Sequence, residues 1–341
     1  MESRFMSPED SRGAESVRVA LMAMATRFEI LLYGSRAEAL RAAAEEALAE
    51  VERLEARLSL YRTDSEIARL NRSTPDQPVR LLPEVWELLR RACVLSEATG
   101  GAFDVTVAPL MECWGFIGGT GRRPPPEAIA AALRCVGSRN LELDVANRTA
   151  RFRQPGMKVD LGGIGKGYAI EQAAEVLREA GVCSALIHGG TSTVYALGSP
   201  PDQPAWQVAV EPPPQLRGKN VPPLAVIALR DRALSVSAVW GKAFEDESGF
   251  HGHVLDPRTG RPVAGAVLAA VVTASPTDAD ALSTALLVLG ERGLALLKHG
   301  WPDLQALVLE RRMRGWHMAT LGLETSWQPP SSTAEGQALP G

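Results

Sequence analysis

The sequence lacks the features that would place it in several common classes of protein. Its four cysteines lie far apart and form no CxxC pair and no cysteine–histidine spacing suited to zinc. Dispersed free thiols of this kind are typical of a reducing compartment. The formal net charge of -4 at pH 7 provides no basic field, so no nucleic-acid partner is expected.

Long hydrophobic runs are also missing. The first sixteen residues are polar and charged, and the apolar stretch at residues 17–34 is interrupted by arginine and glutamate. This pattern suits neither a signal peptide nor a transmembrane segment. As written, the chain is expected to be cytoplasmic. A start codon further upstream would instead allow an export signal and a periplasmic, membrane-associated protein.

Helical and strand-like segments are present, but they alternate irregularly. Apolar residues at helical spacing predict helices over residues 36–58, 83–99, 124–135 and 280–297. Strand patterns lie at residues 17–33, 141–144, 149–153, 183–187, 193–197, 225–229, 234–239, 267–273 and 305–310. We therefore predict an α+β fold, with one large body of mixed, mainly antiparallel sheet and flanking helices.

This body is expected to span residues 16–325. The polar composition of residues 1–15 and 326–341 predicts disordered ends. No internal repeat divides the chain, and its proline-rich stretches are too short to be domain linkers.

The most informative segment is KVDLGGIGKG at residues 158–167, which runs directly into a helical pattern. Glycine N–H groups, the positive end of a helix and a lysine ammonium would converge there on a diphosphate. The segment is not a Walker A loop, because Asp160 replaces the first glycine and Gly167 follows the lysine. It also lacks the G-x-G-x-x-G of a Rossmann fold. By itself, such a strand–glycine–helix junction is equally an ordinary connection.

Two later segments carry further candidate side chains. In GFHGHVLDPRTGRPV, at residues 249–263, His251 and His253 would share one face of a strand. In TASPTDADALSTALLVLG, Asp280 and Thr284 lie one helical turn apart, where two hard oxygens would suit Mg²⁺. Structural alternatives stay open: a tight turn at D-P-R-T-G, and N-capping or dipole complementarity for the aspartates.

Taken in order, these segments resemble the ApbE family, the FAD:protein FMN transferases. The resemblance begins at Met24-Ala25-Thr26 and continues through SLYRTDSEIARLN at residues 59–71. It includes GAFDVTVAPLMECWGF, VDLGGIGKGYAIEQ, GHVLDPRTGRPV and DADALSTALLVLG. These six ordered matches extend over nearly the whole predicted body.

The resemblance implies an activity and a partner. The family is magnesium-dependent, cleaves the diphosphate of FAD, releases AMP, and attaches FMN to a threonine or serine hydroxyl of an acceptor protein. Because this chain contains no convincing acceptor segment, a separate acceptor protein is implied. Contact with the flavin nucleotide is implied for Met24, Tyr61, Ala102, Phe103 and Asp104.

The resemblance also implies the roles of the remaining site residues. Asp160 and Lys166 would hold the ribityl or phosphate region of FAD. The metal ligands would be Asp280, Thr284 and the backbone carbonyl of Gly163. His253 matches the histidine of the family's H-x-x-D-P motif, and we predict that it binds near the nucleotide and acts as general base, with an aspartate at the metal as its competitor. Lys166 and Asp280 complete the predicted catalytic set, since cleavage of a phosphoanhydride requires charge neutralisation.

Two segments depart from the family pattern. The family's Thr-Ser-Gly is Val236-Ser237-Ala238 here, and its Gly-Gly-Asp is Gly189-Gly190-Thr191. Both lie where the flavin pocket is expected, so acceptor choice or nucleotide fit would be altered. Two alternative functions therefore stay open. One is an FAD diphosphatase that gives FMN and AMP, and the other is a non-catalytic FAD-binding protein.

Overall fold

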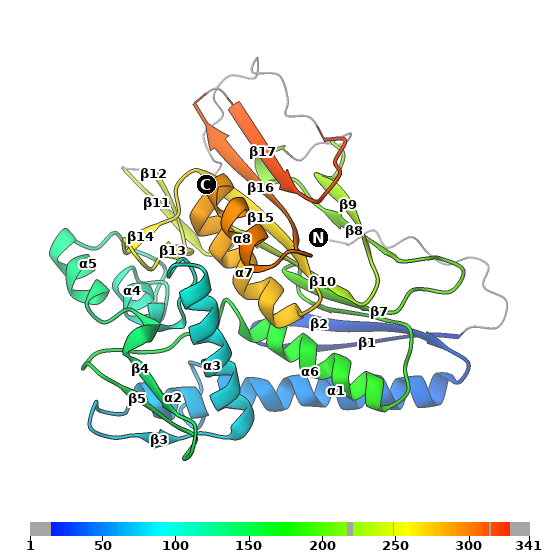
Figure 1. The fold of residues 1–341 in the computed structure, drawn as a ribbon, viewed down its shortest axis with the longest axis horizontal. Coiled ribbons are helices and arrows are strands. Elements are labelled where there is room, and N and C mark those ends of the chain that lie inside the picture. Colours follow the sequence, from blue (N-terminus) through cyan, green and yellow to red (C-terminus); the bar gives the residue numbers. More distant parts are fainter. Residues whose placement is uncertain (1–14, 217–220, 248, 314, 328–341) are drawn as a thin grey trace.

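The computed structural model describes residues 15–216, 221–247, 249–313 and 315–327 (Figure 1). The ends predicted to be disordered, 1–15 and 326–341, lie almost entirely outside these residues. Glu15 begins the first strand, and Trp327 is buried in a hydrophobic cluster. The folded body therefore extends slightly beyond the predicted limits of 16–325.

One large sheet forms the centre of the molecule, and the predicted α+β fold with flanking helices is confirmed. Its eight strands are all paired antiparallel. In spatial order they are β1 (Glu15–Ala23), β2 (Thr26–Gly34), β6 (Ala185–Gly189), β7 (Thr193–Leu197), β10 (Arg232–Ala238), β15 (Ala266–Thr273), β16 (Gln305–Arg312) and β17 (Gly315–Leu321).

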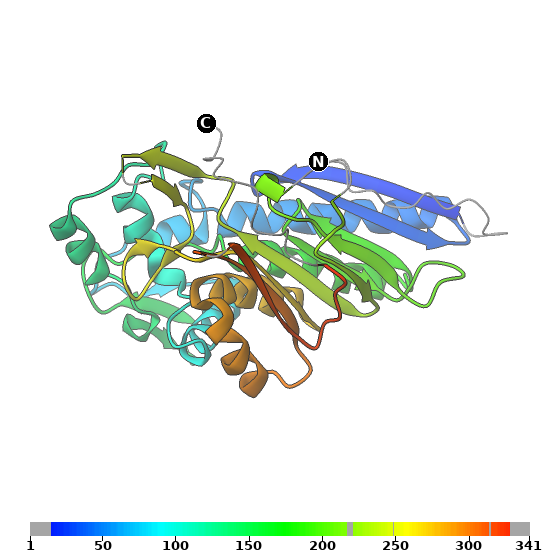
Figure 2. The same ribbon diagram turned by 90° about the horizontal axis from the view of Figure 1, so that it is seen from above.

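Helices cover one face of this sheet, where the largest hydrophobic core lies (Figures 1 and 2). They are α1 (Ala37–Leu58), α6 (Gly165–Glu179), α7 (Pro276–Leu289) and α8 (Gly293–Gly300). Helix α1 is rich in alanine and leucine, and its buried residues recur at helical spacing along one stripe, at Leu40, Ala44, Ala47, Val51, Leu54 and Leu58. Within the described part of the chain, no helix combines the length and the hydropathy needed to cross a membrane.

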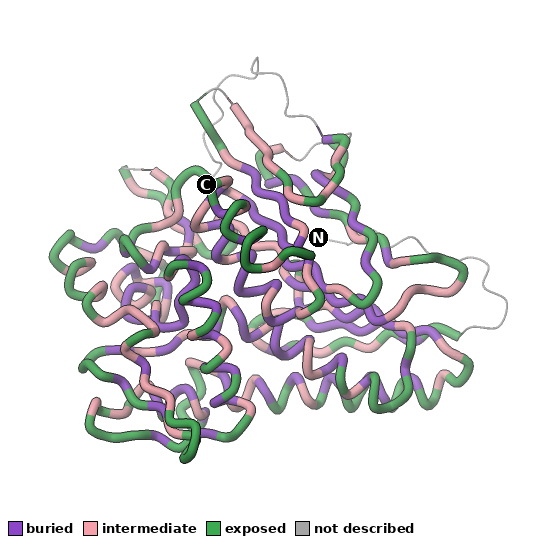
Figure 3. The backbone as a smooth tube through the Cα atoms, in the orientation of Figure 1, coloured by how far each residue is buried: buried purple, intermediate pink, exposed green. Residues whose placement is uncertain are grey.

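A two-stranded hairpin, β8 (Trp206–Val210) and β9 (Ala225–Leu229), covers the opposite face. Its side chains form a second core with the sheet, in which the rings of Trp206 and Tyr33 lie 5.7 Å apart. Figure 3 shows buried residues concentrated along the central strands, as expected for a sheet covered on both sides.

A smaller lobe contains the segment between α1 and α6. Its elements are α2 (Glu66–Asn71), β3 (Val79–Arg80), α3 (Pro83–Ala98), the 3₁₀ turn η1 (Val105–Val107), α4 (Ala108–Cys113), α5 (Pro126–Leu133), the 3₁₀ turn η2 (Ser138–Asn140), β4 (Leu141–Asp144) and β5 (Thr149–Phe152). Two short hairpins lie beside this lobe (Figure 2): β11 (Ala243–Asp246) with β12 (Gly249–Gly252), and β13 (Leu255–Asp256) with β14 (Arg261–Pro262). The lobe and the hairpins share a third, aromatic core around Trp114 and Phe244.

The last predicted helix, at residues 280–297, is wrong in its limits. Helix α7 begins four residues earlier, because Ser275 caps it and Pro276 suits its first turn. It ends at Leu289, because the following Gly290 has a φ of +65°, outside the helical region. The 3₁₀ turn η4 (Gly290–Arg292) and the separate helix α8 follow. Strands β8 and β17 and the short strands β3, β11, β13 and β14 were not predicted from the sequence.

Candidate active site at the start of helices α6 and α7

The glycine-rich segment packs the first turn of α6 against α7. The N–H of Gly167 donates to Oδ2 of Asp280 at 3.0 Å. A Cβ on Gly167 would lie 2.2 Å from the carbonyl oxygen of Pro276 and 2.8 Å from Cβ of Asp280, so a side chain would force the helices apart. A Cβ on Gly163 would lie 3.3 Å from Oγ1 of Thr284. The three predicted metal ligands are thus neighbours.

A network of hydroxyl groups from β7, β10 and α7 supports two of these ligands. Asp280 is only 3% exposed, and its Oδ1 accepts from Oγ1 of Thr193 at 3.4 Å. The Oγ1 of Thr284 donates to the carbonyl oxygen of Asp280 at 3.1 Å. The hydroxyl–hydroxyl contacts are Thr193–Ser235 at 3.0 Å, Ser235–Ser283 at 3.2 Å, Ser283–Ser237 at 2.8 Å and Ser237–Thr284 at 3.3 Å. Satisfied buried networks of this kind hold their members in one arrangement.

The network shows which residues of the altered segment in β10 face the proposed site. Residues 233, 235 and 237 of this strand face the helices, whereas Leu234 and Val236 contact the second core. Ser237, which the chain shares with the family pattern, therefore contacts Thr284. Val236 replaces the family's threonine on the opposite face, away from the proposed ligands.

Lysine and carboxylate groups lie beside the metal-ligand set. Lys166, in the first turn of α6, donates from Nζ to the carbonyl oxygen of Gly162 at 3.1 Å. Asp160 accepts the N–H of Gly162 at 2.8 Å. Burial raises the pKa of Asp160, while the Gly162 bond and the charges of Lys166 and Lys242 oppose that shift. Two ammonium groups are thus close enough to Asp160 to influence its carboxylate.

His253 lies near the same two lysines. Its backbone N–H and its Nδ1 both contact the carbonyl oxygen of Lys242 at 3.0 Å. Because that oxygen only accepts, the neutral ring carries its proton on Nδ1 and a lone pair on Nε2. Burial lowers the pKa of His253, the Lys242 carbonyl opposes this, and the charges of Lys166 and Lys242 lower the pKa further. The surroundings therefore favour a neutral imidazole that can accept a proton.

The residues predicted to contact the flavin occupy different environments. Met24 lies in the β1–β2 turn with φ +50°, where its N–H donates to Oε1 of Glu55 at 2.7 Å. Tyr61 is 66% exposed. Ala102 and Phe103 are buried, and Phe103 lies beside Gly163, 3.4 Å from the position of a Cβ on that glycine. Of this group, the structure brings Phe103 directly to the metal-ligand set.

Asp104 has a structural task. It is buried, and its carboxylate accepts from the Oγ of Ser96 at 3.0 Å, from both N and Oγ1 of Thr106 at 2.8 and 2.6 Å, and from the N–H of Ser138 at 2.8 Å. These bonds join α3, η1 and η2 and fix the loop that carries Phe103. A contact between Asp104 and a flavin nucleotide stays a prediction.

Two other side chains in these segments, those of His251 and Asp278, also have structural partners. His251 contacts Oδ1 of Asp246 at 2.9 Å, and its ring lies 4.9 Å from that of Phe244, so it belongs to the aromatic core. Asp278 forms an ion pair with Arg91 at 2.8 Å. For these two residues, the structural alternative accounts for the side chain.

Comparison with known proteins identifies the family. A family model described as the ApbE family matches residues 24–308. The chain belongs to the ApbE family. The FAD:protein FMN transferase of Haemophilus influenzae is 33% identical over 256 residues, 72% of each chain. That of Treponema pallidum is 30% identical over 313 residues, covering 86% of this chain and 85% of the relative.

Solved structures agree with this assignment. The apo flavinyl transferase ApbE of Pseudomonas stutzeri superposes with a TM-score of 0.80 and 28% identity, over 92% of this chain and 97% of that one. The ApbE protein of Thermotoga maritima gives a TM-score of 0.78 and 28% identity, over 87% and 94% of the two chains. The ApbE-family fold therefore extends over nearly the whole described chain.

The site of this ApbE-family chain fits a magnesium ion. Asp280, Thr284 and Gly163 offer a carboxylate, a hydroxyl and a backbone carbonyl, and Mg²⁺ prefers such hard oxygens. Glycine at position 163 keeps space open beside Thr284. In the described ranges, no group of three or more His, Cys, Asp or Glu side chains is arranged to hold a metal. A bound Mg²⁺ would combine this mixed set with water and substrate oxygens.

Sequence reasoning missed several residues of the ApbE-family site. Thr193, Ser235 and Ser283 support Asp280, and Lys242 supplies both a charge and the carbonyl partner of His253. These residues come from four elements or loops, and no spacing along the chain connects them. Ser283 and Ser237 lay in segments that the family pattern had marked, but neither was singled out there.

Proposed function

We propose that this protein transfers FMN from FAD to a threonine or serine hydroxyl of an acceptor protein, in a magnesium-dependent reaction that releases AMP. Family membership and the names of the relatives support flavin transfer. The observation that carries the proposal is the contact between α6 and α7, which brings Gly163, Thr284 and Asp280 together beside Lys166. The charge of Lys166 also reaches His253.

Each group has a defined part in the proposed reaction. The acceptor hydroxyl oxygen attacks the FMN phosphorus, a new P–O bond forms, and the bond to the AMP oxygen breaks, so AMP leaves with the bonding electrons. Nε2 of His253 takes the hydroxyl proton. Asp280, Thr284 and Gly163 would hold Mg²⁺, which when bound supplies charge neutralisation at the diphosphate oxygens. Lys166 adds a positive charge beside the same oxygens.

The competing base, an aspartate at the metal, is less well placed. Asp280 is buried and already accepts from the N–H of Gly167 and from Thr193. Its remaining capacity is proposed to serve the metal. His253 has neutral character and an available lone pair, which favours it as the proton acceptor.

Incubation with FAD, Mg²⁺ and a threonine-containing acceptor peptide separates the three candidate functions. Covalent flavin on the peptide, found by mass spectrometry together with released AMP, supports the transferase. Free FMN and AMP with an unmodified peptide would support the diphosphatase. Intact bound FAD without AMP would support the binding protein.

The metal site is tested with Asp280→Asn. The amide keeps the volume of the side chain and an oxygen that can accept from Gly167, but it removes the negative charge. We expect AMP release to be lost, because the diphosphate charge is then poorly compensated. Asp76→Asn, at an exposed position, is the control and should retain wild-type turnover. Full activity in Asp280→Asn would contradict the proposed metal site.

A further inference from the structure

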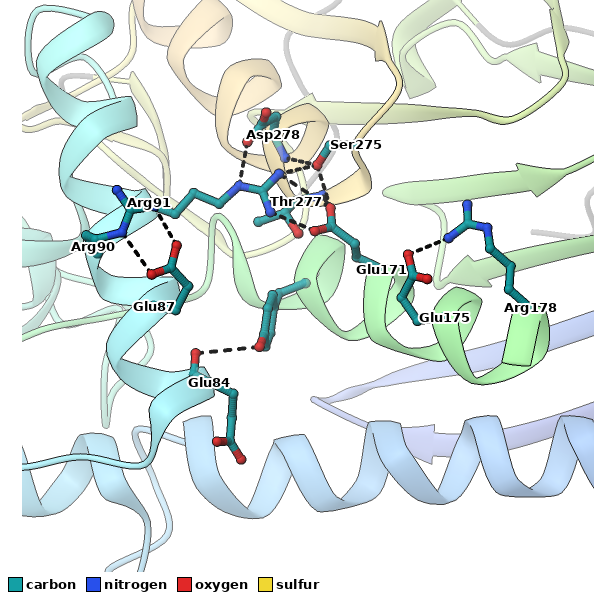
Figure 4. A network of polar contacts seen from close by, with 11 residues as sticks. Glu84, Glu87, Arg90, Arg91, Glu171, Glu175, Arg178, Ser275, Thr277 and Asp278 are labelled. Carbon is teal, nitrogen blue, oxygen red and sulfur yellow. Dashed lines mark hydrogen bonds and ion pairs between the residues drawn. The ribbon is translucent and has the colours of Figure 1, made fainter. Parts of the chain in front are cut away.

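Close to the proposed site, the side chain of Arg91 joins three helices, α3, α6 and α7 (Figure 4). Arg91 projects from α3. Its Nε donates to Oδ1 of Asp278 at 2.8 Å, its Nη1 donates to Oε1 of Glu171 at 2.6 Å, and its Nη2 donates to Oγ of Ser275. All three nitrogens of the guanidinium are therefore used: Nε binds the first turn of α7, Nη1 binds α6, and Nη2 binds the N-cap of α7 and, at 3.4 Å, Oε2 of Glu171 on α6.

The partners of Arg91 are also bonded to one another. Oε2 of Glu171 accepts from Ser275 and from the N–H of Thr277 at 3.3 Å. Oγ of Ser275 accepts the N–H of Asp278 at 3.1 Å, which caps α7. The carboxylate of Glu171 thus binds the N-terminus of α7 directly, and Arg91 fixes that carboxylate in place. We call this set of five residues the Arg91 clamp.

The clamp differs from the exposed ion pairs on the same helices. The Arg91, Glu171 and Asp278 side chains are 26%, 21% and 23% exposed, whereas neighbouring Arg90 and its partner Glu87 are 48% and 52% exposed. Exposed pairs contribute little to stability, but a half-buried, multiply bonded guanidinium restricts the groups around it. Burial lowers the pKa of Arg91, yet Asp278 and Glu171 more than reverse this. The two carboxylates therefore stabilise the charged guanidinium of Arg91.

The clamp lies close to the proposed ligands along both helices. Glu171 follows Gly167 by four residues, about 6 Å along α6. Asp278 precedes Asp280 by two residues in α7. The clamp thus joins α6 and α7 within four residues of the bond between the N–H of Gly167 and the carboxylate of Asp280.

We propose that Arg91 is a positioning residue for the metal and diphosphate site. It holds α6 and α7 at the separation at which Asp280 is oriented by Gly167 and lies beside Thr284, while Lys166 faces the substrate. This inference rests on the proposed magnesium-dependent function and assigns part of its geometry to a side chain that touches neither metal nor substrate.

The test measures metal binding directly, with Mn²⁺ alone as the probe, by electron paramagnetic resonance. In Arg91→Met we expect binding to weaken by about tenfold to a hundredfold, as is typical when a residue that orients ligands is lost. Arg91→Lys keeps the charge but not the planar fork, so it should fall between Arg91→Met and wild type. Arg90→Met, which removes an exposed arginine from the same helix, should bind Mn²⁺ like wild type.

Arg91→Met leaves two half-buried carboxylates without their partner and could fail to fold. The neutral variant Arg91→Met/Glu171→Gln/Asp278→Asn removes that charge imbalance and should show the same weakened binding. A second measurement is the Mg²⁺ dependence of AMP release. The half-saturating Mg²⁺ concentration should rise by a similar factor, with a much smaller change in kcat at saturating metal.

The possible results are distinguishable. If the wild-type protein neither binds Mn²⁺ nor releases AMP from FAD with Mg²⁺, the proposed function fails. If wild type does both and the folded Arg91 variants match Arg90→Met in Mn²⁺ affinity, the positioning role alone is overturned.

Discussion

The pKa values of two side chains in the site are shifted so as to favour their neutral forms, and burial is the largest cause of both shifts. Burial raises the pKa of Asp160 and lowers that of His253. Lys166 and Lys242 oppose the first shift and reinforce the second. The ammonium groups of Lys166 and Lys242 therefore lie close to both side chains, which is an arrangement suited to a polyanionic substrate such as a dinucleotide.

The altered pKa of His253 predicts a pH dependence. A base must be neutral, and a lowered pKa keeps His253 neutral below its ordinary value of 6.5. We expect kcat/KM to fall as the pH decreases through a midpoint below 6.5. His253→Ala should reduce turnover by about 10²- to 10⁴-fold and remove this acid limb. Rates measured from pH 4.5 to 8.5 provide the check.

His299, exposed on α8, is the matched control for that experiment. His299→Ala should keep both the rate and the pH profile of wild type. Wild-type turnover in His253→Ala at every pH would remove this histidine from the proton transfer.

Only part of the site was predictable from the sequence at this scale. Lys166, Asp280 and Thr284 stood out because each lies in a motif with its own chemical logic. Thr193, Lys242 and Arg91 lie in segments without such a motif, and they reach the site only through the pairing of distant strands and the packing of helices. Asp104 shows the converse, since a residue in a recognised motif is used for loop architecture.

At the scale of elements, the α6–α7 contact is the feature on which the site depends. The sequence predicted both helices, because their apolar residues recur at helical spacing. It misplaced the start of α7, since the apolar pattern begins later than the cap at Ser275. The close approach of the two helices could not be predicted from either helix by itself.

Gly167→Ala tests this contact. The added Cβ would meet the carbonyl of Pro276 at 2.2 Å, and backbone cannot move aside cheaply. We expect the free energy of unfolding to fall by about 1–3 kcal/mol, as is typical of overpacking, and Mn²⁺ binding to weaken as well. Urea denaturation and metal titration measure the two effects.

Gly165→Ala, one position before Lys166, is the control. A Cβ there would have its nearest neighbour at 3.7 Å, an ordinary contact with Leu161. This variant should be as stable as wild type and bind metal normally. Equal behaviour of the two alanine variants would show that helix proximity at Gly167 is not limiting.

At the scale of the whole molecule, the two faces of the central sheet have different functions. One face packs on the helices that carry the site, and the other packs on the β8–β9 hairpin. Composition and strand patterns predicted an antiparallel α+β body. Composition and strand patterns could not predict the strand order, because β2 pairs with β6 and β7 pairs with β10 across long stretches of intervening chain.

Trp206→Ala tests this separation. Trp206, the first residue of β8, is buried between the hairpin and the sheet and packs on Tyr33, so its loss should lower the free energy of unfolding by about 3–5 kcal/mol. Under conditions where the variant is folded, its Mn²⁺ affinity should equal that of wild type. Val226→Ala, at a position of β9 that is 56% exposed, should have little effect on either quantity. Weakened metal binding in folded Trp206→Ala would contradict the independence of the two faces.

Strand β10 serves both faces through the simple alternation of its side chains. Ser235 and Ser237 face the helices, and Leu234 and Val236 face the hairpin. Deleting a single residue inside this strand would exchange hydroxyls for hydrocarbon on both sides at once. An insertion in the preceding turn, where Asp231 has φ +52°, would leave that alternation intact. Evolutionary length variation should therefore accumulate outside β10, since within it folding and chemistry would be lost in a single step.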